Sequence, residues 1–241
     1  RERRGRAPAA GGRPEHPFEM LNPSIKGDTT TLDVDVVIVG SGCGGAVVAA
    51  ELAAAGRRVL VLEKGSYVPR EGITGLEGDA FDRLYERGGL QNSEDTGMMV
   101  LSGASFGGGS TVNWACCLRT PDHVRREWAE DLGLPRIASD EFGCSLDAVC
   151  SRIRVTGDGV AHNENNRLLW EGCERCGYSV EVAPQNMADV SPGAAGAGDI
   201  SLGDRYGIKQ SMTETFLRDA AGARVPARFL ERCNSLCVLH E

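Results

Sequence analysis

The sequence predicts an α/β fold of the Rossmann type, with a central parallel sheet and helices on both faces. Three consecutive segments carry this prediction. Residues 34–39 form a short β-branched run, which is typical of a strand buried on both faces of a parallel sheet. The next segment, SGCGGAVVAAELAAAG, is made of small helix formers and stops at Gly56, a natural C-cap, before a second apolar run from Arg58 to Glu63. Strand, helix and strand within about 30 residues form a βαβ unit.

The N-terminal segment has a different composition from the rest of the chain. Residues 1–31 are rich in Arg, Pro, Gly and Thr and lack apolar periodicity, so we expect a disordered tail, followed by a folded part at residues 32–241. Apolar residues make up 41% of the chain, which is enough for a buried core. The formal net charge of −8 argues against a nucleic-acid partner, because the only dense basic cluster is RERRGR at the N terminus.

Later segments are assigned by periodicity and by turn residues. Thr120, Pro121 and Asp122 supply the cap and first turn of one of the predicted helices. The chain ends on its last predicted strands, so we expect the sheet to be incomplete at the C terminus. We predict helices at 76–87, 122–131, 139–152 and 164–176 and within 209–221, a long loop at 184–204, and one or two strands within 227–241.

The loop after the first strand matches the dinucleotide-binding pattern GxGxxG. Gly40 allows the tight turn, Gly42 lets the backbone approach a pyrophosphate, and Gly45 lets helix and strand pack closely. Glu63 lies 18 residues after Gly45, where its carboxylate can accept hydrogen bonds from a ribose and would repel the 2′-phosphate of NADP. A chance glycine-rich turn is the alternative, and FAD and NAD stay open at this point. The residues expected to bind the dinucleotide are Gly40, Ser41, Gly42, Cys43, Gly44, Gly45, Glu63 and Lys64.

A second glycine-rich loop, Gly103 to Trp114, follows some 60 residues later. An NAD domain has no standard need for it, whereas FAD is longer and is bound extended, so a second loop along its pyrophosphate and flavin edge is reasonable. A mobile surface loop is the alternative. The apolar residues at 98–101 and at Trp114 favour a buried loop instead.

Taken together, these motifs resemble the glucose–methanol–choline (GMC) oxidoreductases, and within them the long-chain fatty alcohol oxidases of plants, algae and yeasts. The resemblance covers residues 33–241 as the N-terminal part of an FAD-binding domain. Ala104 departs from it, because the wider family often has a basic or amide residue there, and residues 184–208 lack the cysteines of the long-chain oxidases. The similar segments are DVVIVGSGCGGAVVAAELA, VLVLEKGSYV, LEGDAFDRLYERGG, GGGSTVNWACCLRTP and KQSMTETFLRDA.

The resemblance implies FAD-dependent oxidation of a long-chain primary alcohol to an aldehyde, with hydride passing to the flavin and then to O2, giving H2O2. It also implies a possible membrane association, which leaves the localisation open. On this analogy the second loop lies against the pyrophosphate and isoalloxazine, and the final strand touches the adenine end. The implied contacts are Gly107, Gly108, Gly109, Ser110 and Asn113 in the loop and Ser235 in the strand.

The sequence offers no convincing catalytic base. His16, His123, His162 and His240 lie in a tail, at a helix start, before a polar helix and next to the last residue, where surface or capping roles are more common. The family's catalytic histidine and its partner lie near the C terminus of a much longer chain. We therefore hypothesise that this chain is an N-terminal portion that holds FAD but lacks the catalytic base and most of the substrate domain.

The cysteines predict neither a metal site nor a disulfide framework. Cys173 and Cys176 form a CxxC without a second pair, and the nine cysteines have irregular spacing, which favours a reducing, intracellular compartment. The longest uncharged run in the first hundred residues, Val36 to Ala50, is too short and too rich in glycine for a membrane-spanning helix.

Two alternatives to the long-chain alcohol oxidase remain. One is another FAD oxidoreductase, either a sterol oxidase or a dehydrogenase with an acceptor other than oxygen. The other is a non-catalytic dinucleotide-binding protein. Under every reading, an unfinished sheet would expose apolar edges, so we expect the chain to be marginally stable or prone to aggregation.

Overall fold

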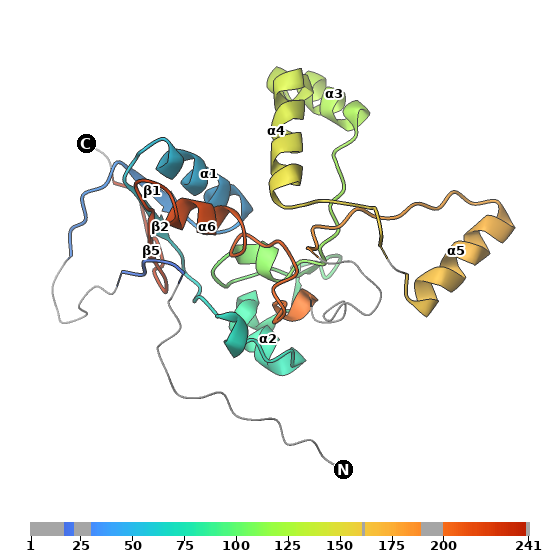
Figure 1. The fold of residues 1–241 in the computed structure, drawn as a ribbon, viewed down its shortest axis with the longest axis horizontal. Coiled ribbons are helices and arrows are strands. Elements are labelled where there is room, and N and C mark those ends of the chain that lie inside the picture. The colour runs from blue at the N-terminus through green and yellow to red at the C-terminus, as the bar shows by residue number, and fades with distance from the viewer. Residues whose placement is uncertain (1–16, 22–29, 161, 189–199, 240–241) are drawn as a thin grey trace, which may run out of the picture.

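A three-stranded parallel sheet lies at the centre of the fold. The computed structural model describes residues 17–21, 30–160, 162–188 and 200–239. The sheet contains β1 (Val36–Val39), β2 (Val59–Leu62) and β5 (Arg228–Leu230) in the order β1-β2-β5, and α1 (Cys43–Ala54) connects the first two strands (Figure 1). The predicted βαβ unit and its Rossmann-type parallel sheet are confirmed.

The register of the sheet brings the two strand ends that matter for ligand binding to one edge. Val39 pairs with Leu62, and the amide of Gly40 donates to Leu62 O at 2.7 Å. The amide of Glu63 in turn donates to Leu230 O on β5 at 2.9 Å. Because all three strands are parallel, the loops that follow β1 and β2 leave from the same edge.

The main core forms where α1 packs on α6 (Phe216–Ala221), and Figure 1 shows these two helices side by side above the sheet. The buried face of α1 consists only of alanines, which allow a close approach of the two helices. These alanines are Ala46, Ala49, Ala50 and Ala53.

The burial of β1 differs from the prediction. Val37 and Val39 share one face of the sheet and are 52% and 63% exposed, while Ile38 on the other face is buried. No described helix covers the Val37 face, so the predicted burial on both faces is wrong for this strand. β1 also lies at a sheet edge, with a strand neighbour on one side only among the described residues.

Part of the expected tail belongs to the core. Phe18 is buried, and its ring lies 5.0 Å from that of Phe106 and 5.4 Å from that of Phe229. Residues 19–21 run parallel to β5 and exchange two backbone hydrogen bonds with Phe229. The prediction of a disordered tail over 1–31 is therefore wrong at residues 17–21, because an aromatic side chain anchors them; positions 1–16 and 22–29 lie outside the described residues.

The other helices mostly follow the prediction. The expected helix at 76–87 ends earlier, at Leu84, because Tyr85 adopts an extended backbone with φ −106° and ψ 150°; the short 3-10 turn Glu86–Gly88 follows it. The expected helix within 209–221 starts only at Phe216. The region 227–241 forms one strand, with residues 231–239 in loop and 240–241 outside the described part. The remaining helices are α2 (Glu77–Leu84), α3 (Asp122–Asp131), α4 (Asp140–Arg152) and α5 (Glu164–Cys176).

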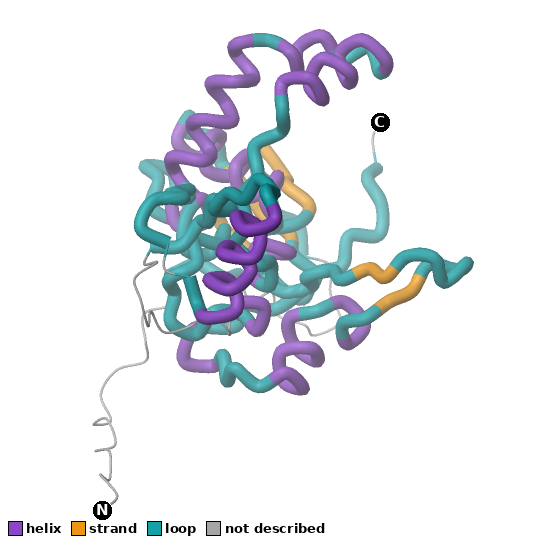
Figure 2. The backbone as a smooth tube through the Cα atoms, turned by 90° about the vertical axis from the view of Figure 1, so that its right-hand side faces the viewer, coloured by secondary structure: helices purple, strands orange, loops and turns teal. Residues whose placement is uncertain are grey.

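Two parts of the chain extend away from the sheet. α3 and α4 lie together, and α5 stands apart at the end of an arm (Figure 1). A hairpin of β3 (Gln91–Asn92) and β4 (Met99–Val100) projects from the body (Figure 2). The predicted loop at 184–204 contains isolated bridges at Gln185 and Met187, and its residues 189–199 lie outside the described part.

Candidate functional site

The first glycine loop has the backbone geometry that its pattern predicts. Gly40 adopts φ +93°, so the turn out of β1 uses a conformation that favours glycine. A Cβ on Gly45 would lie 2.0 Å from Gly40 O, which means that α1 crosses β1 at a distance only glycine permits. The turn and the close packing are therefore both present.

The N-terminus of α1 is free to bind an anion. Gly42 is its N-cap and brings no side chain to the first amides, and the first turn carries no acidic residue. A Cβ on Gly44 would meet no atom within 4 Å, so the space beside this turn is open. Unpaired amides and the positive end of the helix dipole together favour a phosphate.

Ser41 connects the first loop to β2 and to the second loop. It is fully buried, and its hydroxyl donates to Glu63 Oε2 at 2.6 Å and accepts from the amide of Gly107 at 2.8 Å. Glu63 is also buried, and it accepts from the amides of Ser41 and Gly65 at 2.8 Å each. The Glu63 carboxylate thus holds the first glycine loop in place through Ser41. Its contact with a ribose stays a prediction.

The second glycine loop is a buried element in contact with the first. Gly107 and Gly108 adopt φ +94° and +58°, and a Cβ on Gly108 would lie 2.9 Å from Gly42 Cα. Ser110 is buried, and its hydroxyl donates to Gly107 O at 2.7 Å and accepts from the amide of Met212 at 3.0 Å. These contacts contradict the alternative of a mobile surface loop.

A cavity of about 550 Å³ opens between the two loops. This volume falls in the range of about 300–1,000 Å³ that is usual for cofactor sites. A Cβ on Gly109 would meet no atom within 4 Å, so the backbone borders open space here and a flat ring system can approach it. The cavity is lined mainly by apolar groups: Cys43, Tyr85, Leu101, Gly103, Gly109, Ser110, Val112, Asn113, Trp114 and Cys116.

Three of the residues that we predict to contact the cofactor have side chains that are exposed or bonded to other protein groups. Lys64 is exposed and forms an ion pair with Glu86 at 2.5 Å. Asn113 lines the cavity, while its side-chain oxygen accepts from the amide of Ala115 at 3.3 Å. Ser235 is exposed in the loop after β5, and no described contact links it to either glycine loop. Their cofactor contacts remain predictions.

The titratable groups in the cavity are thiols and a phenol. Burial raises the pKa of Cys43 and that of Tyr85, so both are protonated at neutral pH. His123 is exposed on α3 and the ring of His162 lies 5.3 Å from that of Trp170; neither lines the cavity. His16 and His240 lie outside the described residues.

Possible metal ligands are scattered over the part of the chain that the structure describes. There, no group of three or more His, Cys, Asp or Glu side chains is arranged to hold a metal ion. In the same residues, no helix is both long enough and apolar enough to cross a bilayer.

Sequence reasoning missed Gly65 and Lys209. A Cβ on Gly65 would lie 2.0 Å from Ala104 O, so this glycine lets the end of β2 pack against the start of the second loop. Lys209 is buried, and its ammonium donates to backbone carbonyls of the second loop. The KQS segment belongs to the family resemblance, but nothing in its spacing shows that it reaches a loop almost a hundred residues earlier.

Comparison with known proteins gives two family matches. Residues 81–241 match the family described as GMC oxidoreductase, and residues 38–68 match the NAD(P)-binding Rossmann-like domain. The two matches cover the second and the first glycine loop, respectively.

Curated relatives match most of this chain. Long-chain-alcohol oxidase FAO4A of Arabidopsis thaliana is 41% identical over 196 residues, which is 81% of this chain and 26% of that protein. Long-chain-alcohol oxidase FAO4B of the same plant is 45% identical over 186 residues, covering 77% and 24%. The chain thus spans about a quarter of the length of these relatives. A crystal structure of formate oxidase aligns with a TM-score of 0.31 and 25% identity over 40% of this chain and 19% of that one.

Proposed function

This chain belongs to the GMC oxidoreductase family, and we propose that it holds FAD for the oxidation of long-chain primary alcohols to aldehydes, with O2 as the electron acceptor and H2O2 as the second product. Family membership confirms the prediction of FAD over NAD as the dinucleotide. The observation that carries the proposal is the contact between the two glycine loops beside an apolar cavity.

The proposed position of FAD follows from the order of these features. The free amides at the start of α1, from Gly42 to Gly44, would bind the pyrophosphate, and Glu63 would bind the ribose. The cavity beside Gly109 and Asn113 would hold the isoalloxazine. In this proposal the adenine end extends toward Ser235, since the amide of Cys233, two residues earlier, donates to Glu63 O at 2.9 Å.

The residues of this chain bind and orient, and the bound flavin supplies the ability to accept a hydride from the alcohol carbon. Leu101, Val112 and Trp114 give the cavity an apolar lining that suits an alkyl chain. The protein's tasks here are to hold the ring and to admit the substrate.

The substrate class is proposed from the relatives, whose names state that they oxidise long-chain alcohols. A sterol oxidase, or a dehydrogenase that uses another acceptor, would need the same cofactor site. A non-catalytic dinucleotide-binding protein would not need the second loop and its cavity.

Titration of the purified chain with FAD and with NAD tests the cofactor. We expect quenching of flavin fluorescence at a one-to-one ratio and no competition by NAD. FAD should also protect Cys43 and Cys116 from alkylation, because both line the cavity, whereas the exposed Cys176 on α5 should react equally fast with and without FAD. A chain that ignores FAD, or that binds it without protecting these two thiols, would contradict the proposed site.

The substrate class is tested on the FAD-loaded chain by the visible spectrum of the flavin. Dodecanol should perturb this spectrum at lower concentrations than butanol, because a longer alkyl chain buries more apolar surface. Cholesterol should leave the spectrum unchanged. The opposite order would favour a sterol substrate. The electron acceptor is tested after photoreduction of the bound flavin: reoxidation by O2 with one H2O2 formed per flavin supports the oxidase, and reoxidation by a dye but not by O2 supports a dehydrogenase.

A further inference from the structure

Lys209 is hydrogen-bonded to the end of the second glycine loop. Its side chain is 1% exposed, and its Nζ donates to Thr111 O at 2.8 Å, Asn113 O at 2.9 Å and Ile200 O at 2.5 Å. An ammonium has three protons to donate, so these bonds use all of them. Two of the three acceptors belong to the loop that borders the cavity.

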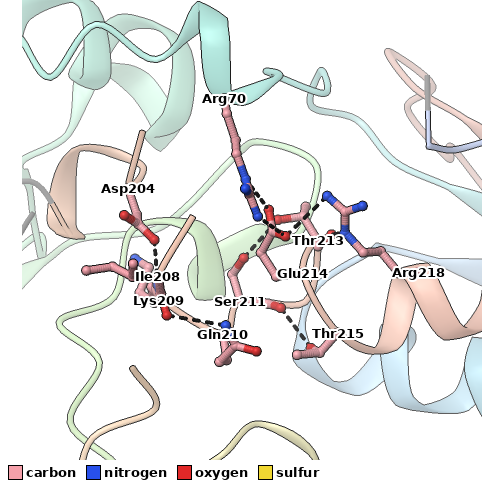
Figure 3. Close-up of polar contacts among 10 residues, drawn as sticks. All are labelled: Arg70, Asp204, Ile208, Lys209, Gln210, Ser211, Thr213, Glu214, Thr215 and Arg218. Atoms are coloured by element: carbon pink, nitrogen blue, oxygen red, sulfur yellow. Dashed lines mark hydrogen bonds and ion pairs between the residues drawn. The ribbon is translucent and has the colours of Figure 1, made fainter. Parts of the chain in front are cut away.

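The burial of the charged Lys209 side chain costs free energy, so filling space alone does not explain a lysine at this position. Burial lowers the pKa of Lys209 to about 7, and the nearby carboxylate of Asp204 opposes this effect only in part. Asp204 Oδ2 accepts from the backbone amide of Lys209 at 2.5 Å, and burial raises the pKa of Asp204 (Figure 3). A methionine would fill a similar volume without the cost of burying a charge. What a methionine lacks is the ability to orient carbonyl groups.

The residues after Lys209 support the same loop at two further points. The amide of Met212 donates to Ser110 Oγ at 3.0 Å, and a Cβ on Gly107 would lie 2.9 Å from Thr213 Cγ2. Glu214 then pins this segment by accepting from Arg70 at 2.5 Å and from Arg218 at 3.2 Å (Figure 3). The segment from Lys209 to Glu214 thus packs against the loop from Gly107 to Asn113.

We propose that Lys209 is a positioning residue for FAD, which sets the path of the loop from Gly107 to Asn113 by binding the carbonyls of Thr111 and Asn113. This inference rests on the proposed FAD site. The lysine itself does not touch the cavity; it acts through the backbone that lines it.

The test compares Lys209→Met with a matched control, Thr215→Val. Thr215 is buried directly after this segment, and its hydroxyl donates to Ser211 O at 2.7 Å instead of to the glycine loop. Thermal melting of the apo chain and fluorescence titration with FAD are measured for both. We expect both variants to melt earlier, but K209M to raise the Kd for FAD about tenfold or more and T215V to change it less than about twofold. Lys209→Arg, which keeps a cationic donor, should recover part of the affinity.

Three outcomes are distinguishable. Failure of the wild-type chain to bind FAD overturns the proposed function itself. A wild-type chain that binds FAD while K209M binds it equally well, or while both variants lose affinity in proportion to their stability, overturns the role of Lys209. If K209M does not fold, ¹³C labelling of the three lysines of the wild-type chain decides. Saturation with FAD should shift the ε-carbon signal of Lys209, and an unmoved signal overturns the proposal.

Discussion

Gly42 has room for a methyl group in the protein without FAD. If FAD binds as proposed, the complex has no such room. The φ of −66° at Gly42 suits alanine, and a Cβ there would lie 3.9 Å from Gly108 Cα, an ordinary contact. Gly42→Ala should therefore leave the melting temperature nearly unchanged and weaken FAD binding by about tenfold or more, because the methyl occupies the path of the pyrophosphate. Melting curves and FAD titrations of the same preparations measure both.

The control for this substitution is Gly172→Ala. Gly172 is exposed in the middle of α5, and a Cβ there meets no atom within 4 Å. The change should stabilise the helix by about 0.5–1 kcal/mol and leave FAD binding alone. Equal FAD affinity in G42A and the wild type would place the pyrophosphate elsewhere.

The buried ammonium of Lys209 predicts how stability depends on pH. Its pKa is about 7 in the folded chain and 10.5 in the reference state, so between these values only the unfolded chain keeps the proton. Unfolding then takes up a proton, and the free energy of unfolding rises with pH across this window by up to about 1.4 kcal/mol per pH unit. Below pH 7 both states are protonated and the contribution is constant.

Urea unfolding of the wild type and of Lys209→Met from pH 6 to 10 isolates this term, because the variant lacks the titrating group. The difference in free energy of unfolding should shift in favour of the wild type above pH 7. A difference that is flat, or that falls, would show that the ammonium keeps its ordinary pKa in the folded chain.

The sequence pattern predicted a site residue only where the partners of that residue lie close to it in the sequence. The turn at Gly40 and the close packing at Gly45 follow from a pattern within six residues, and both are found. The inward-facing hydroxyl of Ser41 depends on the amide of Gly107, 66 positions later, and Lys209 depends on Thr111, 98 positions earlier. Such partners are chosen by the tertiary fold, which one-dimensional spacing does not encode.

Secondary structure was predictable where the signals lie within the element itself, in its caps, turn residues and periodicity. α3, α4 and α5 lie within a residue of their predicted bounds, and α4 and α5 begin at the side-chain caps Ser139 and Asn163. The segment before Phe216 has helical propensity but is not a helix, because its backbone and side chains bind the second loop instead. Tertiary contacts overrode propensity there.

The packing of α1 on α6 gives a prediction for these elements. Ala49 is fully buried on the alanine face of α1, where α6 approaches closely. Ala49→Leu should overpack this contact and lower the free energy of unfolding by about 1–3 kcal/mol, as measured by urea titration. Val48→Leu, on the exposed side of the same helix, should change it by less than about 0.5 kcal/mol. Equal stability of the two variants would mean that the helices do not meet at Ala49.

At the scale of the whole molecule, many large apolar side chains of the described residues are exposed. Leu90, the stretch 98–101 and Trp114 are all exposed beside the cavity, and Leu168 and Leu169 are exposed on the arm of α5. The face of β1 that carries Val37 and Val39 adds to this surface. Large exposed apolar patches promote association, and the expected tendency of the chain to aggregate stays a prediction.

The chemistry available to the whole chain is limited by what lines the cavity. Hydride transfer from an alcohol needs a base that takes the hydroxyl proton. The titratable side chains on the described cavity wall are Cys43, Tyr85 and Cys116, and burial raises the pKa of the first two, which makes them poor proton acceptors at neutral pH. We therefore expect the FAD-loaded chain to bind dodecanol without oxidising it.

Anaerobic mixing with dodecanol tests this expectation through the visible absorption of the flavin. The absorption should persist with the alcohol and disappear with dithionite, which shows that the bound flavin can be reduced. If dodecanol bleaches the flavin, and if this bleaching depends on a deprotonated group of the protein, the chain itself supplies a base. Repeating the experiment with Tyr85→Phe and with Cys43→Ser would then identify it, since each variant removes one titratable group from the cavity wall.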